Sequence, residues 1–317
     1  MKWKGIRHRA EYIAFRLVVC LLQILTPNQS ARLARGLAVV LTDWLPRRLT
    51  RYDVARETLQ AAFPVQLSQA DVRRMIRAMR TRLFGVVAES VRLPRRVQLN
   101  RVHEVIRFRN HGLVVRALCS GRPVILLSGH FGNWEMAVAV FGLFGFPMGV
   151  VARELDNPHL NRWFRRFRQS TGHVMLAKKG GYDDMLALIG RKGHLAMLGD
   201  QDAGGRGLFV DFFGRPASTF KSIALLALEY RALICVGYAY RLPDDPVNQS
   251  FPRFELGCEA MIDPDKIESN DPVGEVTRQY TAALQRAIER APEQYFWVHR
   301  RWKSQPAARR SRSSKAA

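Results

Sequence analysis

Short apolar runs alternate with longer amphipathic segments through the central part of the chain. The runs have the length of buried strands, and the segments between them repeat apolar side chains at helical spacing. Strands that alternate with helices predict an α/β fold, with a mostly parallel central sheet flanked by helices. The expected strands are Val124–Leu127, Met148–Ala152, His173–Leu176, Leu195–Leu198 and Leu233–Tyr240.

The first 45 residues carry two apolar patterns of helical period. Ile13–Leu25 would be about 20 Å long as a helix, which is shorter than the roughly 30 Å hydrocarbon core of a bilayer. Ala31–Leu45 places its apolar side chains on one helical face, and both segments are flanked by Arg and Trp. We therefore expect residues 1–45 to be helices that lie on a membrane or anchor shallowly in it. The alternative is a helical cap that packs on the core.

The rest of the chain divides into three regions by composition. Residues 46–120 have a helical and basic pattern, in which Ser68 and Asp71 have the spacing of a helix-capping pair. Residues 121–304 form the expected α/β core. Residues 305–317 are rich in Ala, Ser and Arg, which predicts a disordered basic tail.

Charge narrows the choice of partner. The 317 residues include 50 Lys and Arg against 27 Asp and Glu, a formal net charge of +23. The apolar fraction of 47% and charged fraction of 24% exclude a disordered, collagenous or polytopic membrane protein. The excess of positive charge indicates an anionic partner, such as a phospholipid surface, nucleic acid or an acidic carrier.

No metal or nucleotide cofactor is expected from motifs. The four cysteines are far apart and lack zinc-binding spacing, which favours free thiols in a reducing compartment. The chain has no phosphate-binding G-x-x-x-x-G-K-[ST] loop, no G-x-G-x-x-G and no H-E-x-x-H. It also lacks the G-x-S-x-G turn of serine hydrolases, which counts against a lipase.

His130 and Glu135 are the first candidates for chemistry. On one continuous helix they would lie about 140° apart, so they would not meet. With His130 in the turn after a strand and Glu135 on the next helix, Glu135 can orient the imidazole, and the free nitrogen can act as a base. No serine or cysteine adjoins them, so the nucleophile would be a substrate hydroxyl. The alternative is a structural histidine paired with a local carboxylate.

Gly129–Glu135 resembles the H-x-x-x-x-D/E block of the bacterial lipid A late acyltransferases, which are related to the lysophospholipid and glycerolipid acyltransferases. Asp200–Asp202 with Gly207–Gly214, and then Pro292–Lys303, are similar to two further blocks of that family in the same order. The resemblance extends to about residue 305. It implies a glycerolipid acyltransferase-like αβα core.

The resemblance also implies a reaction. A fatty acyl group would pass from a thioester of acyl carrier protein or coenzyme A to a hydroxyl of a membrane glycolipid, such as a lipid A precursor. His130 would take the proton and Glu135 would orient it. Arg168, which matches the family's arginine before a glycine, is the first candidate to stabilise the oxyanion, and Arg153 is the second. Asn133, Asp200 and Gln201 are further candidates to bind substrate.

Two aromatic clusters complete the predicted site. Phe209, Phe212 and Phe213 would line an acyl-chain groove, or else belong to the core. A second cluster would meet lipid phosphates at the membrane surface, or would stack on nucleic acid in a protein that binds it. This second cluster consists of Trp297, Arg300, Arg301, Trp302 and Lys303.

The leading interpretation is therefore an acyltransferase on the cytoplasmic side of a bacterial inner membrane, with no nucleic-acid partner. A non-catalytic binder of anionic lipid or nucleic acid would explain the charge but would leave the His130 block without a role. Within enzymes, a phosphatidylinositol mannoside-like lipid, another glycolipid or a lysophospholipid is an alternative acceptor.

Overall fold

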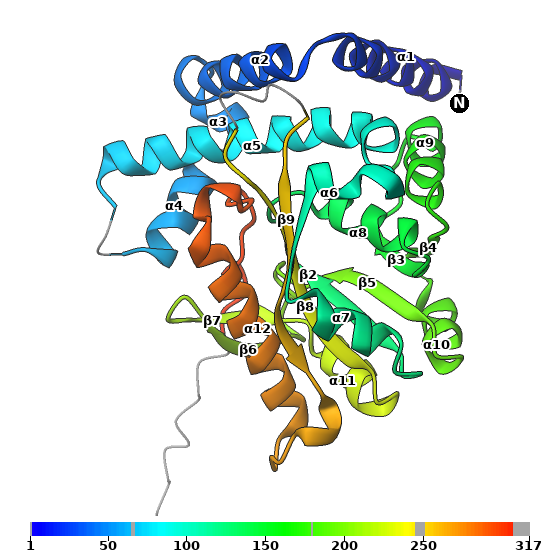
Figure 1. The fold of residues 1–317 in the computed structure, drawn as a ribbon. Coiled ribbons are helices and arrows are strands. Elements are labelled where there is room, and N and C mark those ends of the chain that lie inside the picture. The colour runs from blue at the N-terminus through cyan, green and yellow to red at the C-terminus, as the bar shows by residue number, and fades with distance from the viewer. Residues whose placement is uncertain (1, 65–66, 179, 245–250, 307–317) are drawn as a thin grey trace, which may run out of the picture.

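The computed structural model describes residues 2–64, 67–178, 180–244 and 251–306. A seven-stranded sheet in the order β1-β9-β8-β2-β5-β3-β4 forms its centre (Figure 1). Neighbouring strands run parallel except for β8 and β9, so the mostly parallel α/β fold is confirmed. The strands are β1 Ile106–Arg109, β2 Val124–Ser128, β3 Met148–Ala152, β4 Val174–Ala177, β5 His194–Leu198, β8 Leu233–Arg241 and β9 Phe254–Ile262.

The expected strands β2, β3, β4, β5 and β8 form with ends shifted by one residue at most. β1 is a departure, because it lies inside the segment 46–120 that was expected to be helical, where it pairs with β9. A separate hairpin of β6 (Leu208–Phe212) and β7 (Arg215–Thr219) stands beside the main sheet. All but the first two residues of the predicted tail lie outside the described residues.

Helices cover both faces of the sheet. On one face α7 and α8 pack against Val124 and Leu126 of β2. On the other face α10, α11 and α12 pack against Ile125 and Leu127 of the same strand. Because both faces of β2 are buried, its sequence is continuously apolar rather than alternating. These helices are α7 His111–Leu118, α8 Trp134–Leu143, α10 Tyr182–Gly190, α11 Lys221–Glu229 and α12 Pro272–Arg290.

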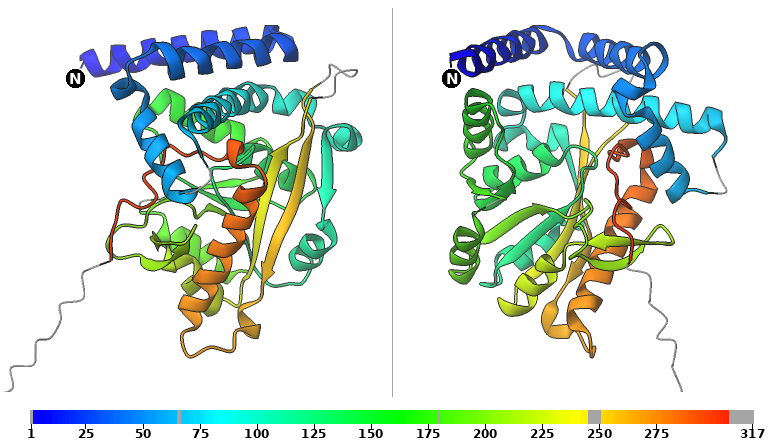
Figure 2. Two further views of the ribbon diagram at one scale, coloured as in Figure 1. Left: turned by 90° about the vertical axis from the view of Figure 1, so that its left-hand side faces the viewer. Right: turned by 180° about the vertical axis from the view of Figure 1, so that it is seen from behind.

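The N-terminal helices lie across α5, at the top of Figure 1 and in both views of Figure 2. Val19 and Leu22 of α1 are buried against Ala88 and Val91 of α5. Ser68 and Asp71 form the predicted capping box of α5. The elements of this part are α1 Lys2–Ile24, α2 Pro27–Val39, η1 Val40–Trp44, α3 Arg47–Thr50, α4 Tyr52–Ala62, α5 Gln69–Arg96, η2 Leu99–Arg101 and α6 Val102–Val105.

Two buried arginines of α5 hold these helices in place. Arg80 donates to the backbone carbonyls of Leu41 and Thr50, and Arg92 donates to those of Leu22 and Leu25. No helix in the described ranges has the length and apolar character needed to cross a bilayer. The remaining helices are α9 Pro158–Gln169, η3 Pro264–Lys266 and η4 Pro292–Gln294.

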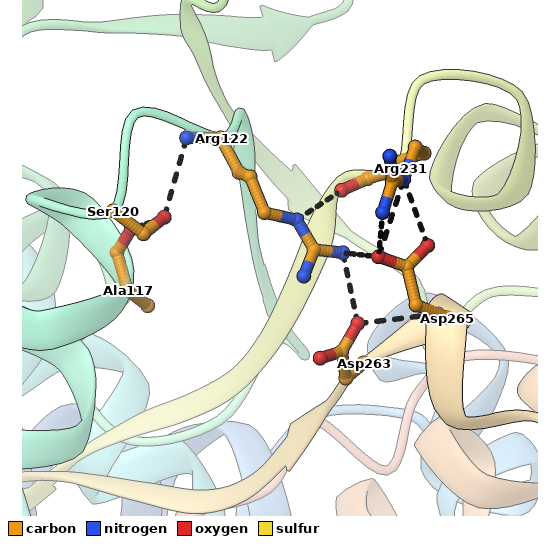
Figure 3. A network of polar contacts seen from close by, with 6 residues as sticks. All are labelled: Ala117, Ser120, Arg122, Arg231, Asp263 and Asp265. Carbon is orange, nitrogen blue, oxygen red and sulfur yellow. Dashed lines mark hydrogen bonds and ion pairs between the residues drawn. The ribbon is translucent and has the colours of Figure 1, made fainter.

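A charged network closes the edge of the sheet at which β2 and β8 begin (Figure 3). Arg122, just before β2, donates to the Arg231 carbonyl at 2.8 Å and pairs with Asp263 at 2.8 Å. Arg231, just before β8, pairs with Asp265 at 2.7 Å. The parallel strands end at the opposite edge of the sheet, which is where the sites of open α/β folds lie.

Candidate active site

His130 lies in the turn between β2 and α8, and two glycines explain the shape of that turn. A Cβ on Gly129 would meet the Asp200 carboxyl group at 3.2 Å. Gly132 has a φ of 58°, and a Cβ there would lie 2.0 Å from the carbonyl oxygen of Ala239. Gly129 must lack a side chain so that the Asp200 carboxylate can approach, and Gly132 must lack one so that β8 can pass.

Asp200 is the acidic partner of His130. It follows β5, which pairs with β2, so both residues stand at the carboxyl ends of adjacent parallel strands. Its Oδ1 lies 2.9 Å from His130 Nδ1, and its Oδ2 accepts from the His130 backbone N–H at 2.9 Å. Burial alone would raise the pKa of Asp200, but the charge and hydrogen bonds of His130 outweigh burial and lower the pKa to about 2.

The predicted contact between His130 and Glu135 is wrong. Glu135 lies in the first turn of α8, but its two oxygens accept from Arg168 Nε at 3.0 Å and Nη2 at 2.6 Å. A bidentate guanidinium is a stronger partner for a half-buried carboxylate than an imidazole whose Nδ1 already bonds to Asp200. Glu135 therefore positions Arg168, which comes from α9.

The C-terminal segment wraps around the His130 turn. The backbone N–H of Phe296 donates to the His130 carbonyl at 2.9 Å, and that of Gly132 donates to the Gln294 carbonyl at 3.1 Å. Three rings also surround the imidazole, with centroids at 5.4 Å for Trp134, 6.4 Å for Phe296 and 4.6 Å for His299. This packing fixes the ring and limits the water that reaches it.

His299 belongs to the Pro292–Lys303 block and was expected with the basic cluster at the membrane surface, not at the active centre. Its ring stands edge-on to His130, and a nitrogen of His299 lies within 4.8 Å of ligand atoms of both His130 and Asp200. Burial lowers the pKa of His299 to about 4, and the Asp200 charge offsets this only in part. His299 is therefore neutral at physiological pH.

Trp297 and Arg301 were expected at a membrane surface, and that expectation is wrong. Trp297 is fully buried, and its indole N–H donates to the Pro292 carbonyl. Arg301, 1% exposed, donates to the carbonyls of Gln201 and Ser218 and to the Thr219 hydroxyl. An arginine fork can be buried where several backbone oxygens accept from it, and here it fixes the loop that carries Asp200.

The remaining members of that cluster differ in exposure. Trp302 is half-buried against Phe212, with ring centroids 5.9 Å apart. Arg300 and Lys303 are exposed, so a role in lipid contact stays a prediction for these two residues.

A cavity of about 880 Å³ opens beside His130 at the carboxyl end of the sheet. Its wall is mostly apolar and includes residues from both faces of β2, among them Leu126 and Leu127. Its volume lies within the range of small-ligand sites. Arg168, Arg153 and Gln201, which were expected to bind substrate or the oxyanion, belong to its wall, and so does Glu135.

The other residues expected at the substrate lie elsewhere. Asn133 is fully buried, where its amide donates to Glu89 and its Oδ1 caps α8 by accepting from the Met136 N–H. Phe212 and Phe213 belong to a core cluster with Trp297, so the prediction of an acyl groove there is wrong. Phe209 is half-buried on β6 and does not line the cavity.

This arrangement defines the class of protein. Asp200 is ionised at neutral pH and cannot donate a hydrogen, so His130 Nδ1 carries the hydrogen between them, and Nε2 is left as the acceptor. Within the described residues, no serine hydroxyl or cysteine thiol is hydrogen-bonded to His130. A base without its own nucleophile, at the head of an apolar cavity, is typical of an enzyme that activates a hydroxyl of a lipid-like substrate.

The comparisons with known proteins identify the family. Residues 3–304 match the family model described as bacterial lipid A biosynthesis acyltransferase, and the chain belongs to this family. It is an acyltransferase.

Individual relatives are more distant. The lipid A biosynthesis palmitoleoyltransferase of Escherichia coli K12 is 27% identical over 275 residues, which cover 82% of this chain and 81% of that protein. The phosphatidylinositol mannoside acyltransferase of Mycolicibacterium smegmatis is 31% identical over 123 residues, 37% of this chain and 40% of that protein. The solved structure of the 1-acyl-sn-glycerophosphate (LPA) acyltransferase PlsC from Thermotoga maritima has 12% identity and a TM-score of 0.38, over 81% of this chain and 97% of that chain.

Proposed function

We propose that this protein transfers a fatty acyl group from a thioester to a hydroxyl of a membrane glycolipid, with His130 as the general base. The observation that carries the proposal is the His130–Asp200 pair at the head of the large apolar cavity. An acyl chain needs such a cavity, and the hydroxyl that receives it needs a base with a free nitrogen.

The steps follow from the hydrogen bonding of His130. Nε2 of His130 takes the proton of the acceptor hydroxyl, while the hydroxyl oxygen attacks the carbonyl carbon of the thioester. The C–O bond forms, and the carbonyl oxygen becomes an oxyanion. Collapse of this intermediate breaks the C–S bond, and the leaving sulfur takes the proton from the imidazolium. Asp200 holds the tautomer and stabilises the imidazolium throughout.

Arg168 is the best group to stabilise the oxyanion. The backbone N–H groups of His130, Phe131, Gly132 and Asn133 all donate to protein oxygens, so this turn offers no free amide pair. Arg168 lines the cavity and uses Nε and Nη2 on Glu135, while its Nη1 makes no hydrogen bond within the described residues. Arg153, with a largely exposed side chain, suits a phosphate at the rim.

The N-terminal helices support attachment to a membrane surface. One stripe of α1 is apolar and exposed, and it lies opposite the buried residues Val19 and Leu22. On the buried side α1 meets α9, where Phe15 contacts Trp163 and Asn157 donates to the His8 carbonyl. Because α9 carries Arg168, docking this stripe on lipid would bring the cavity close to the bilayer. The stripe consists of Trp3, Ile6, Ile13, Leu17, Leu21 and Ile24.

We infer the substrates from the family and its relatives. A lipid A precursor is the first acceptor, supported by the family model and by the palmitoleoyltransferase relative. A mannosylated phosphatidylinositol is the second, supported by the mycobacterial relative. Acyl carrier protein and coenzyme A are both proposed as thioester carriers. The site of action would be the cytoplasmic face of the inner membrane, where a soluble donor meets a lipid acceptor and where anionic phospholipids attract the basic chain.

An acyl-transfer assay tests this function. Purified protein is incubated with each acceptor and with a labelled acyl thioester of either acyl carrier protein or coenzyme A. The products are identified by mass spectrometry. We expect one acceptor to gain the mass of one acyl chain, and we expect His130→Gln to abolish that gain. His103→Gln, at an exposed histidine, is the matched control and should retain activity. Full transfer by His130→Gln would refute the proposal.

A further inference from the structure

Three side chains from separate stretches of the chain converge at the active centre. His130, Asp200 and His299 each offer one ligand atom, and these atoms all lie within 4.8 Å of one another. We propose that this cluster is a binding site for Zn²⁺, and that zinc bound there inhibits the enzyme. Zinc spacing was absent from the sequence because the fold, rather than a local motif, brings the three together.

The donor set fits zinc. Two imidazoles and one carboxylate form a common protein ligand set for Zn²⁺, and three protein ligands leave a further coordination position open. His130 lines the cavity and has a side chain that is 21% exposed, so an ion has a path to the cluster. Nitrogen ligands favour Zn²⁺ over Mg²⁺ or Ca²⁺, which prefer oxygen.

His299 makes the set more than a catalytic pair. Its Nε2 is buried, and it has no hydrogen-bond partner within the described residues. Coordination through Nε2 would therefore cost His299 no existing bond, and it would satisfy a polar atom that is otherwise buried alone. Asp200 is fixed by the backbone N–H of His130, which leaves its geometry supported when the ion replaces the hydrogen on the imidazole.

Two nearby cations limit the affinity. Arg301 and Arg51 both act electrostatically on His299, and only one carboxylate of the cluster opposes the ion's charge. We therefore expect weaker binding than that of a structural zinc site.

The inhibitory effect rests on the proposed function. A metal that takes the place of the hydrogen on His130 Nδ1 leaves the imidazole hydrogen on Nε2, so Nε2 can no longer accept the proton of the acceptor hydroxyl and acyl transfer stops. Metal binding itself is a property of the three side chains, and it is measurable without any acyl substrate.

Binding is tested first, on the full chain after removal of metal with a chelator. Cys20 and Cys119 are exposed thiols that bind zinc adventitiously, so both are replaced by serine in every variant. Zn²⁺ is titrated in competition with a chromophoric chelator. We expect one ion per chain, and at least about tenfold weaker binding in His299→Gln, because the loss of a direct ligand exceeds that of a supporting group. His103→Gln should bind like the parent.

Zinc binding and inhibition by zinc are tested separately. Zinc binding that is unchanged in His299→Gln, or that is absent from the parent, overturns the site. Acyl transfer is then measured over the same zinc range. Inhibition that follows the measured occupancy supports the inhibitory role. Full activity at saturating occupancy overturns that role and also contradicts His130 as the base, while leaving the metal site intact.

Discussion

His130 is placed by two glycines and by a carboxylate 70 residues further along the chain. The sequence predicted the histidine and its place in the turn after a strand. It selected Glu135 as the partner because Glu135 is near in sequence, whereas the structure selects Asp200 because β2 and β5 are neighbours. Only the strand order contains that information, and local spacing does not reveal it.

The Glu135–Arg168 ion pair should act as a unit. We expect Glu135→Ala and Arg168→Ala each to lower kcat/KM by about 10²-fold, the typical effect of losing an oxyanion donor. Because Glu135 acts through Arg168 in this account, the double variant should be little worse than either single variant. Steady-state kinetics of the three variants measure this coupling. Losses that multiply in the double variant would show that the two residues act independently.

His173 should make stability depend on pH. Its Nδ1 accepts from the Met148 N–H, and burial lowers its pKa. The imidazole therefore binds a proton more readily in the unfolded chain than in the folded one. The contribution of neutral His173 to the free energy of unfolding is complete above about pH 6.5 and decreases as the pH falls. His173→Asn, which keeps an acceptor that cannot be protonated, should show a flatter decline between pH 7 and 5 in urea unfolding. An equally steep decline in this variant would exclude the assignment.

Among the elements, the strands and the helices between them were the most predictable, because their apolar patterns are fixed by burial. The C-terminal segment was the least predictable. A cluster of Trp and Arg has the same composition at a membrane surface as in a core where arginines bind backbone carbonyls. Arg301 illustrates this, since three oxygen acceptors from β7 and the Gln201 loop allow it to be buried.

Arg301 and Arg300 are matched neighbours for testing that segment. Arg301→Lys loses the fork that spans Ser218 and Thr219, so we expect unfolding to become easier by about 2–4 kcal/mol. Acyl transfer should also fall, because the fork holds the Gln201 carbonyl next to Asp200. Arg300→Lys, at an exposed site, should change stability by less than about 0.5 kcal/mol. Urea unfolding measures the stability of both variants. Equal free energies of unfolding would contradict a structural role for the buried Arg301 fork.

The exposed stripe of α1 is tested without removing the helix. Deletion of residues 1–45 would leave Arg92 without its acceptors and would take the Leu41 carbonyl from Arg80, so it would damage the fold. Leu17, 67% exposed, lies within the stripe, whereas Gln23 is exposed outside it. We expect Leu17→Glu to weaken binding to anionic phospholipid vesicles by about tenfold, from lost apolar burial. Gln23→Glu carries the same added charge and should bind nearly as the parent does. Equal binding of both in vesicle sedimentation would refute docking through α1.

At the scale of the whole molecule, the class of fold followed from the alternation of strands and helices, but the cavity did not. The phenylalanines expected to line it belong to the core, and its wall is built from residues of both sheet faces that no single motif contains. The amino edge of the sheet is closed by ion pairs, and the carboxyl edge holds the base, the cavity and Arg168. The central claim is that Asp200 makes His130 a base at that edge.

The most direct test is the rate of acyl transfer by Asp200→Asn. The amide cannot stabilise the imidazolium and can favour the wrong tautomer, so we expect kcat to fall by about 10²–10⁴-fold. Thermal unfolding should confirm that the variant is folded. A folded Asp200→Asn protein with the parent's rate would contradict the account.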